Sequence, residues 1–202
     1  MEKKLDVVFI LDKSGSMSGS EENTISSFNE YLEREKNNKF KTRITTILFS
    51  DDYSYLHKGL DVSKVKPLTH KDYYVGGCTA LYDAIGSSIN YIDKCDTDKV
   101  MFIIITDGYE NASKEFNNEK IRKMIKSHSN YEFIYIGADI DSYSTGGSIG
   151  ISSSNISNYK KDRKGSGLLF KAVSHFEKSM MFDEDTTNWK DELEEYIEEN
   201  KR

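Results

Sequence analysis

The 202-residue sequence contains few cysteines, a single proline and no long apolar run. Cys78 and Cys95 are too few for a disulfide framework, so we expect two reduced thiols, with one Cys78–Cys95 bridge as the alternative. The longest apolar runs, "VVFIL" and "MFIII", fall far short of the roughly 20 residues that a membrane-spanning helix needs. The small number of cysteines argues against a disulfide-stabilised fold, and the short apolar runs argue against a membrane-spanning protein.

The sequence also lacks an excess of positive charge and the apolar core of a signal peptide. The first residues, "MEKKLDVV", pass directly into a strand-like pattern, so we expect a cytoplasmic protein. The formal net charge of −6 argues against a nucleic-acid binder, because such proteins present a basic face to phosphates. The single proline and the frequent Lys, Asn, Ile and Tyr are typical of an AT-rich bacterial or phage genome.

What the chain does contain is a regular alternation of short apolar runs and helical patterns. Hydrophobic residues make up 37% of the sequence, which is enough to form a core. Short apolar runs predict strands at Leu5–Leu11, Thr42–Ser50, Tyr53–Leu60, Lys99–Thr106, Tyr131–Gly137 and near Asn155–Tyr159. Helical spacing predicts helices within Ser20–Asn37, Ala80–Ile92, Glu115–Ser127 and Leu168–Met181, and a short one after Ser142.

This alternation predicts an α/β fold with a doubly wound, mostly parallel sheet and helices on both faces. The run Tyr53–Leu60 follows a turn signal at Asp51 and Asp52, and we expect it to be an antiparallel hairpin partner at the edge of the sheet. In such folds the ligand lies at the carboxyl ends of the strands, so polar residues that follow strands are the candidates for function.

The end of the chain differs from the rest in composition. We expect residues 1–182 to form one domain and residues 183–202 to form a separate acidic segment. Within that segment, apolar residues recur at helical spacing at Trp189, Leu193, Tyr196 and Ile197. This spacing predicts an amphipathic helix that either packs on the domain or binds another protein.

Three segments place oxygen-bearing side chains where strands or loops end. "DKSGSM" carries Asp12, Ser14 and Ser16 after the first strand, "GGCTALYDAI" carries Thr79, and "TDGYEN" carries Asp107 after the fourth strand. Two carboxylates and three hydroxyls are hard donors, which favour Mg²⁺, with Mn²⁺ or Ca²⁺ as alternatives, over zinc or copper. So few charged ligands would leave a divalent ion under-neutralised.

These segments resemble the metal-ion-dependent adhesion site of von Willebrand factor type A (vWA) domains. The family pattern of Asp-x-Ser-x-Ser, then Thr, then Asp is matched without substitution by Asp12, Ser14, Ser16, Thr79 and Asp107. The resemblance extends over most of the chain in the family's order. The later stretch "YIGADIDSYSTGGSIGI" is similar to the bacterial and phage branch of the family.

The resemblance implies a fold, a set of ligands and a function. The fold would be a six-stranded sheet in the order 3-2-1-4-5-6 with one short antiparallel edge strand. The two serines, the threonine and the two aspartates would bind Mg²⁺ directly or through water, and an acidic side chain of a protein partner would complete the shell. We therefore expect a metal-dependent protein-binding domain of the adhesion or scaffold type, with no catalytic residues. Its oligomeric state is left open.

Two other functions use the same ion. One is a metal-dependent hydrolase or phosphotransferase, and the other is a structural component of a phage or secretion assembly. Asp12 does not resemble the nucleophile of aspartate-based phosphatases, because Ser14 stands where those enzymes carry a second carboxylate. Neither a GxGxxG fingerprint nor a P-loop is present. The histidines have no motif context and are expected on the surface or on helices, at His57, His70, His128 and His175.

Other acidic and amide residues near the three segments have simple structural interpretations. Asp83 is expected either beside Thr79 or in a helix-surface or capping role. Glu110 and Asn111 are expected at the start of a helix, where acidic and Asn side chains are favoured.

Overall fold

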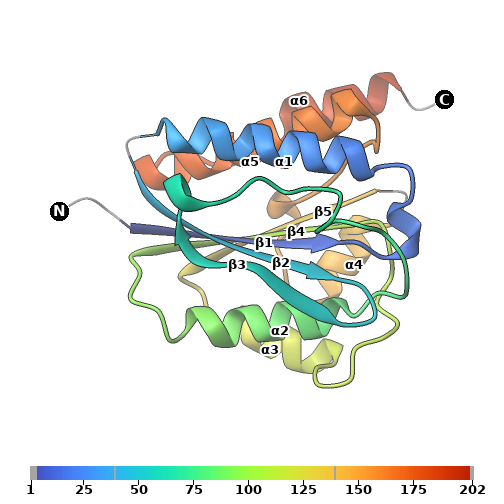
Figure 1. Cartoon of the computed structure of the whole chain (residues 1–202). Coiled ribbons are helices and arrows are strands. Elements are labelled where there is room, and N and C mark those ends of the chain that lie inside the picture. Colours follow the sequence, from blue (N-terminus) through green and yellow to red (C-terminus); the bar gives the residue numbers. More distant parts are fainter. Residues whose placement is uncertain (1–3, 39, 139, 201–202) are drawn as a thin grey trace.

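The computed structural model describes residues 4–38, 40–138 and 140–200. It contains a six-stranded sheet in the order β3-β2-β1-β4-β5-β6, in which only the β2–β3 pair is antiparallel (Figure 1). The strands are β1 (Lys4–Asp12), β2 (Lys41–Phe49), β3 (Tyr53–Asp61), β4 (Lys99–Thr106), β5 (Tyr131–Gly137) and β6 (Ile156–Asn158). The predicted fold class and strand order are confirmed. The ends of the predicted domains at 1–3 and 201–202, and Asp139 of "YIGADID", lie outside the described residues.

The central strands have apolar residues on both sides because helices cover both faces of the sheet. Along β1, Phe9 and Leu11 belong to one hydrophobic cluster, whereas Val8 and Ile10 belong to a second cluster on the opposite face. Successive side chains of a strand point to opposite faces, so a continuous apolar run is needed where both faces are buried. The run "VVFIL" therefore forms a fully buried strand that ends at Asp12.

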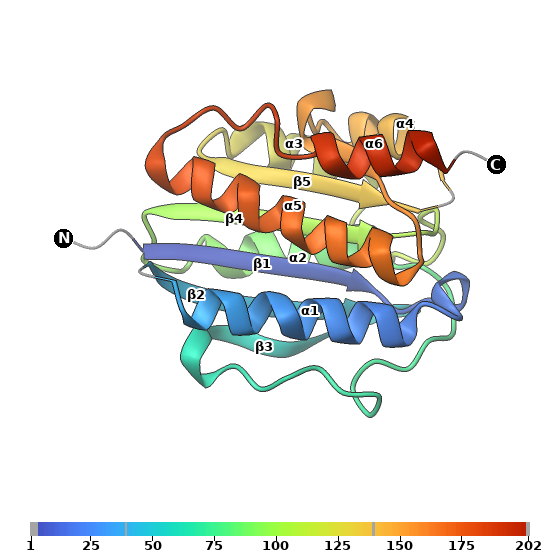
Figure 2. The same ribbon diagram turned by 90° about the horizontal axis from the view of Figure 1, so that it is seen from above.

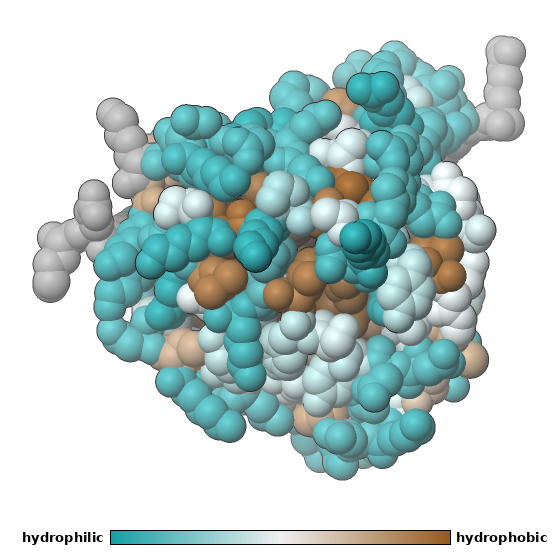
Figure 3. Space-filling model, viewed as in Figure 1, coloured by the Kyte–Doolittle hydropathy of each residue, from teal (hydrophilic) through white to brown (hydrophobic). Residues whose placement is uncertain are grey.

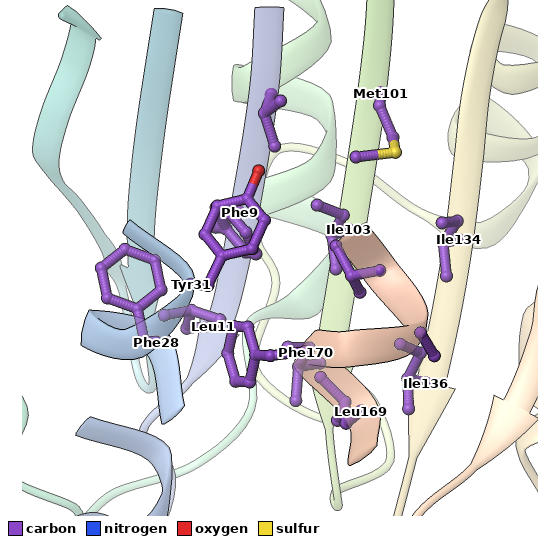
Figure 4. Packing of buried hydrophobic residues seen from close by; sticks show 14 of the residues in the cluster. Phe9, Leu11, Phe28, Tyr31, Met101, Ile103, Ile134, Ile136, Leu169 and Phe170 are labelled. Atoms are coloured by element: carbon purple, nitrogen blue, oxygen red, sulfur yellow. The ribbon is translucent and has the colours of Figure 1, made fainter. Parts of the chain in front are cut away.

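The helices form a layer on each face of the sheet (Figures 1 and 2). One layer contains α1 (Glu21–Lys36), α5 (Arg163–Phe182) and α6 (Asp191–Glu199), and the other contains α2 (Leu81–Ile92), α3 (Asn118–Ser127) and α4 (Ser142–Ser148). Figure 4 shows the first layer's core, where Phe9 of β1 lies among aromatic rings of both long helices. Its ring centroid is 5.1 Å from that of Phe28, 5.0 Å from that of Tyr31 and 6.0 Å from that of Phe170.

Two helices begin at residues other than those expected from the sequence. α3 begins at Asn118 rather than Glu115, because the side chain of Asn117 accepts a hydrogen bond from the Lys120 amide and caps the helix there. α5 begins at Arg163, five residues before the predicted start, because Asp162 caps it through the Gly165 amide. The glycines in "RKGSG" concealed this first turn, since glycine is a poor helix former.

The acidic C-terminal segment lies against the first helical layer. Trp189 and Leu193 are buried members of its hydrophobic cluster, and the Trp189 indole N–H donates to the Ser154 carbonyl at 2.8 Å. Of the two alternatives for the amphipathic helix, packing on the domain is thus the one present in this structure. The division of the chain between residues 182 and 183 stays a prediction.

The edge of the sheet at β3 corrects one expectation. His57 is buried there, 6% exposed, and its Nδ1 lies 3.1 Å from Thr46 Oγ1 of β2, so it is neither a surface nor a helix residue. Around this edge, Figure 3 shows apolar side chains in patches framed by hydrophilic ones.

The structure also bears on two other expectations from the sequence. Cys78 and Cys95 are free thiols, as expected. Of the helices in the described ranges, none has the length and apolar character of a membrane span.

Candidate metal centre

The candidate residues are gathered by the two central strands of the sheet. Asp12 is the last residue of β1, and Asp107 follows the last residue of its parallel neighbour β4. The carboxyl ends of parallel neighbours lie at the same edge, so the two side chains come together. Burial is the main cause that raises the pKa of Asp12, and the nearby charge of Asp107 adds a smaller increase. Both aspartates are buried.

Asp12 is held by the protein at every oxygen. Its Oδ1 accepts a hydrogen bond from the Ser14 amide at 2.7 Å, and its Oδ2 accepts one from Thr106 Oγ1 at 2.5 Å. Its backbone carbonyl accepts from the Tyr73 hydroxyl. Burial raises the pKa of the Asp12 carboxyl, and the hydrogen bonds from Thr106 and Ser14 offset part of that increase. The strand end therefore presents a carboxylate in one fixed orientation.

The two serines connect Asp12 to Asp107. The chain turns after Asp12 into a short 3₁₀ helix, Gly15–Met17, which brings Ser14 Oγ and Ser16 Oγ to 3.0 Å from each other. Ser16 Oγ in turn donates to Asp107 Oδ1. Ser14 is buried and Ser16 is exposed, so the row of oxygens leads from the interior to the surface.

Thr79 is brought to the same edge by a loop that is hydrogen-bonded to the Asp12 loop. The Gly15 amide donates to the Gly77 carbonyl at 3.1 Å, and the Gly76 amide donates to the Lys13 carbonyl at 2.9 Å. Gly77 has a φ of +81°, and a Cβ there would lie 2.1 Å from Asp51 Oδ2, so a larger residue would clash.

The backbone of Thr79 is fixed from the other side by Asn111. The Thr79 amide donates to Asn111 Oδ1 at 2.8 Å, and the Asn111 amide donates to the Thr79 carbonyl at 3.0 Å. Thr79 is only 3% exposed. This two-way pairing leaves the Thr79 hydroxyl as the group that the loop can offer to a ligand.

The three segments meet around Gly108. A Cβ at this residue would lie 2.8 Å from Thr79 Oγ1 and 3.3 Å from Ser16 Oγ. Both hydroxyls therefore face the turn that follows Asp107, and only glycine leaves them this space. The structure thus brings together all five residues predicted as ligands, Asp12, Ser14, Ser16, Thr79 and Asp107.

A cation of the chain itself already lies at this group of oxygens. Lys161 Nζ is 2.8 Å from Asp107 Oδ2 and 3.3 Å from the Ser16 carbonyl oxygen. An ammonium in this place shows that the donors suit a positive charge. Within the described ranges, no three His, Cys, Asp or Glu side chains are grouped so that they could hold a metal ion, so a site here would depend on hydroxyl oxygens. Two carboxylates with three hydroxyls fit Mg²⁺ or a similar hard cation. That these residues bind a metal stays a prediction.

Sequence reasoning missed three residues that shape the group. Thr106, which donates to Asp12, directly precedes Asp107, so its place in "TDG" was a usable signal. Lys161 lies far from the motif segments, and Tyr73 lies three residues before "GGCTALYDAI" but 61 residues from Asp12, so neither has a local pattern that could have pointed to its contact. They reach the group only because the chain folds back.

The loop between β4 and α3 corrects the expectation for Glu110 and Asn111. They do not start a helix; they lie in the loop, where Glu110 bonds to α2 and Asn111 bonds to Thr79. Glu110 accepts hydrogen bonds from the amides of Tyr82 and Ser113, among others. Asp83 caps no helix: it is buried in the first turn of α2, and its carboxylate accepts hydrogen bonds from the amides of residues 114–116, in the loop before α3. Asp51 lies in the predicted turn and also accepts from the Cys78 amide.

Comparison with protein families places this geometry among known domains. Residues 6–163 match the family model described as "von Willebrand factor type A domain". A comparison with curated proteins gave no match.

Solved structures of the same fold have low sequence identity to this chain. PilB minor pilin from Streptococcus sanguinis has a TM-score of 0.68 at 10% identity, covering 91% of this chain and 62% of that one. Proximal thread matrix protein 1 from the mussel byssus has a TM-score of 0.63 at 16% identity, covering 85% and 45%. The same mussel protein is described in another structure "with zinc occupied MIDAS motif", with a TM-score of 0.56 at 17% identity, covering 78% and 41%. This chain therefore spans less than half of the mussel protein's length.

Proposed function

The chain belongs to the von Willebrand factor type A domain family, and from that premise we propose that it is a metal-dependent protein-binding domain of the adhesion or scaffold type. In this proposal a divalent cation, Mg²⁺ first, is held by Asp12, Ser14, Ser16, Thr79 and Asp107. An acidic side chain of a protein partner completes the shell. The observation that carries the proposal is the convergence of these five residues at one edge of the sheet, with a cationic group on Asp107.

The five proposed ligands differ in charge and exposure, and so in what each would contribute. Asp12 and Asp107 provide negative charge, and the hydroxyls of Ser16 and Thr79 provide neutral oxygens beside it. Ser16, at the exposed end of the row, marks the side from which a partner approaches. A bound divalent cation would keep part of its charge and offer one partner carboxylate a strong, directional contact.

The surface around the group is suited to a protein partner. Tyr74 and Tyr109 are 65% and 58% exposed, and they lie in the loops that carry Thr79 and Asp107. Lys13 Nζ lies 4.1 Å from the centre of the Tyr74 ring. Exposed tyrosines are enriched at protein interfaces, and a lysine among them favours an acidic partner. The two tyrosines and Lys13 of the Asp12 loop therefore combine apolar area with positive charge.

Binding is preferred to hydrolysis because the nearby carboxylate is already engaged. Glu110, three residues after Asp107, uses both of its oxygens to accept hydrogen bonds from backbone amides and from the Ser113 hydroxyl. A general base needs a free oxygen within reach of water. Glu110 does not offer one.

The test is selection of a displayed random-peptide library on the immobilised protein, with MgCl₂ or with EDTA. We expect the Mg²⁺-dependent peptides to share an Asp or Glu, and its replacement by Asn or Gln to abolish binding. Ser16→Ala should weaken capture, and because Ser16 is exposed this variant is expected to fold. Glu30→Gln, which removes an exposed carboxylate on α1, is the matched control and should bind as the wild type does.

Two other results would argue against the proposed function. Peptides that bind equally well in EDTA, or that keep binding to the Ser16→Ala variant, would contradict a metal-bridged contact. Mg²⁺-dependent turnover of phosphate esters, lost in Asp107→Ala, would favour the hydrolase instead.

A further inference from the structure

The contact between Lys161 and Asp107 joins parts of the chain that are far apart in sequence. Asp107 has a side chain that is only 1% exposed, and Lys161 is partly buried at 26%. The ammonium lies 2.8 Å from Asp107 Oδ2, while Oδ1 of the same carboxylate accepts from Ser16. Both oxygens of this candidate ligand are thus taken by the chain itself.

The backbone of Lys161 is held in place, so this contact is built into the fold. Its carbonyl accepts a hydrogen bond from Asn23 Nδ2 of α1 at 3.0 Å. The next residue, Asp162, caps α5 through the Gly165 amide and accepts from the Tyr196 hydroxyl of α6 at 2.9 Å. The link between β6 and α5 is therefore anchored, and it holds Lys161 beside Asp107.

We propose that Lys161 is an internal competitor of the divalent cation: its ammonium neutralises Asp107 in the metal-free protein and must leave that carboxylate when the ion binds. The inference rests on the proposed function. Its physical basis is that an ammonium and a divalent cation repel each other, so each lowers the other's affinity for one buried carboxylate. Lys161 thereby lowers the affinity for the ion and protects the metal-free fold from an unpaired buried charge.

The competition sets a threshold for partner binding. At low ion concentration the Lys161–Asp107 pair persists, and no bound ion is present for an acidic side chain of the partner to coordinate. Above the threshold the ion replaces the ammonium, whose flexible four-carbon stem lets it move into solvent. The position of the threshold depends on a residue outside the Asp-x-Ser-x-Ser, Thr and Asp pattern.

The experiment measures Mn²⁺ binding by isothermal titration calorimetry on the full chain and its variants. Lys161→Met keeps the aliphatic stem and removes the charge, and it should bind Mn²⁺ about tenfold more tightly, the effect of freeing a carboxylate from one charge-assisted hydrogen bond. Lys161→Arg keeps the charge and should bind as the wild type does. Lys13→Met removes the same charge from the loop between Asp12 and Ser14, and its effect should stay below about threefold, because its ammonium lies on Tyr74.

Thermal unfolding provides a second readout. In EDTA, Lys161→Met should melt at a lower temperature than the wild type, because Asp107 loses its counter-charge. In saturating Mn²⁺ that difference should disappear.

The outcomes separate this inference from the function on which it rests. Equal Mn²⁺ affinity in the wild type, Lys161→Met and Lys13→Met overturns the competition and leaves the metal-binding function standing. An equal gain in Lys161→Met and Lys13→Met assigns the effect to general charge and also overturns the competition. Absence of Mn²⁺ binding in all variants overturns both the inference and the proposed function.

Discussion

Two pairs of buried carboxylates among the described residues have different surroundings. At the carboxyl ends of the central strands β1 and β4, Asp12 and Asp107 contact hydroxyls, a backbone amide and the ammonium of Lys161. Between α1 and α5, Glu177 meets the Tyr31 hydroxyl at 2.8 Å and lies in the field of Glu35. In the described part of the chain, Glu177 Oε1 has no hydrogen-bond partner.

The difference shows what makes a buried acid suitable for a cation. Burial and the neighbouring Glu35 raise the pKa of Glu177 well above its usual value, which favours the protonated form. It serves the packing of α1 on α5 and has no route to solvent. Asp12 and Asp107 are equally buried, yet hydroxyl and amide donors hold them and Ser16 leads to the surface. Neighbouring donors and access therefore distinguish the predicted ligand group from the packing group.

The largest expected effect comes from removing a carboxylate at the edge of the sheet. Asp107→Asn should weaken Mn²⁺ binding roughly a hundredfold, about 2.7 kcal/mol, because it removes one of the two charged ligands. Titration calorimetry measures the affinity, and circular dichroism checks the fold. Asp52→Asn, which changes an exposed carboxylate in the β2–β3 turn, is the control and should leave the affinity unchanged. Unaltered affinity in Asp107→Asn would remove the distinction between the two pairs.

The contribution of Glu177 to folding stability should depend on pH in the opposite sense from that of an acid whose pKa is lowered by folding. The folded-state pKa of Glu177 is raised, so its contribution to stability is present below the unfolded-state value and is lost as pH rises through the folded-state value. Glu177→Gln removes that dependence. We expect the variant to be more stable than the wild type at pH 8, by about 1.4 kcal/mol for each pH unit above the unfolded-state pKa over which the folded carboxyl stays protonated, and to differ much less at pH 5.

Denaturant unfolding at the two pH values measures this change. Glu30→Gln is the matched control on the exposed side of α1 and should shift neither curve. Mn²⁺ affinity should be the same in both variants. A Glu177→Gln variant that is less stable than the wild type at both pH values would show that the ionised acid is stabilising.

The smallest expected effect tests the shape of the ligand group without changing its charge. In Gly108→Ala the new Cβ would lie 2.8 Å from Thr79 Oγ1, so the hydroxyl must move, and Mn²⁺ affinity should fall by about tenfold, or 1.4 kcal/mol. Gly76→Ala, in the Thr79 loop, meets nothing within 4 Å and should bind normally. Equal affinity in the two variants would mean that Thr79 is not a ligand.

Much of the fold could be predicted because its signals are local. Continuous apolar runs such as "VVFIL" and "KVMFIIIT" predict buried strands, and the helix of residues 81–92 follows from the spacing of Leu81, Ile85, Ile89 and Ile92. The loop after Asp107 was misjudged because its order comes from Glu110 and Asn111, which bond to α2 and Thr79. Contacts between distant segments have no periodic signal.

The same division between local and long-range signals holds for the five predicted ligand residues and their neighbours. The five predicted residues lie in short motifs at the ends of strands, and a motif of small spacing can be read directly from the sequence. Lys161 and Tyr73 could not be found in this way, because their contacts with Asp107 and Asp12 depend on how remote loops pack. The bacterial or phage origin, the cytoplasmic location and the choice of ion stay predictions.

By itself the sequence determined the order of strands and helices, the edge at which oxygen donors gather and the family pattern. It could do so because apolar periodicity and strand-end motifs are properties of neighbouring residues. Only the tertiary structure decided which charge neutralises Asp107, why the pKa of Glu177 is raised and that α6 packs on the domain. Burial and charge pairing depend on distances between residues far apart in the chain, and those distances exist only after folding.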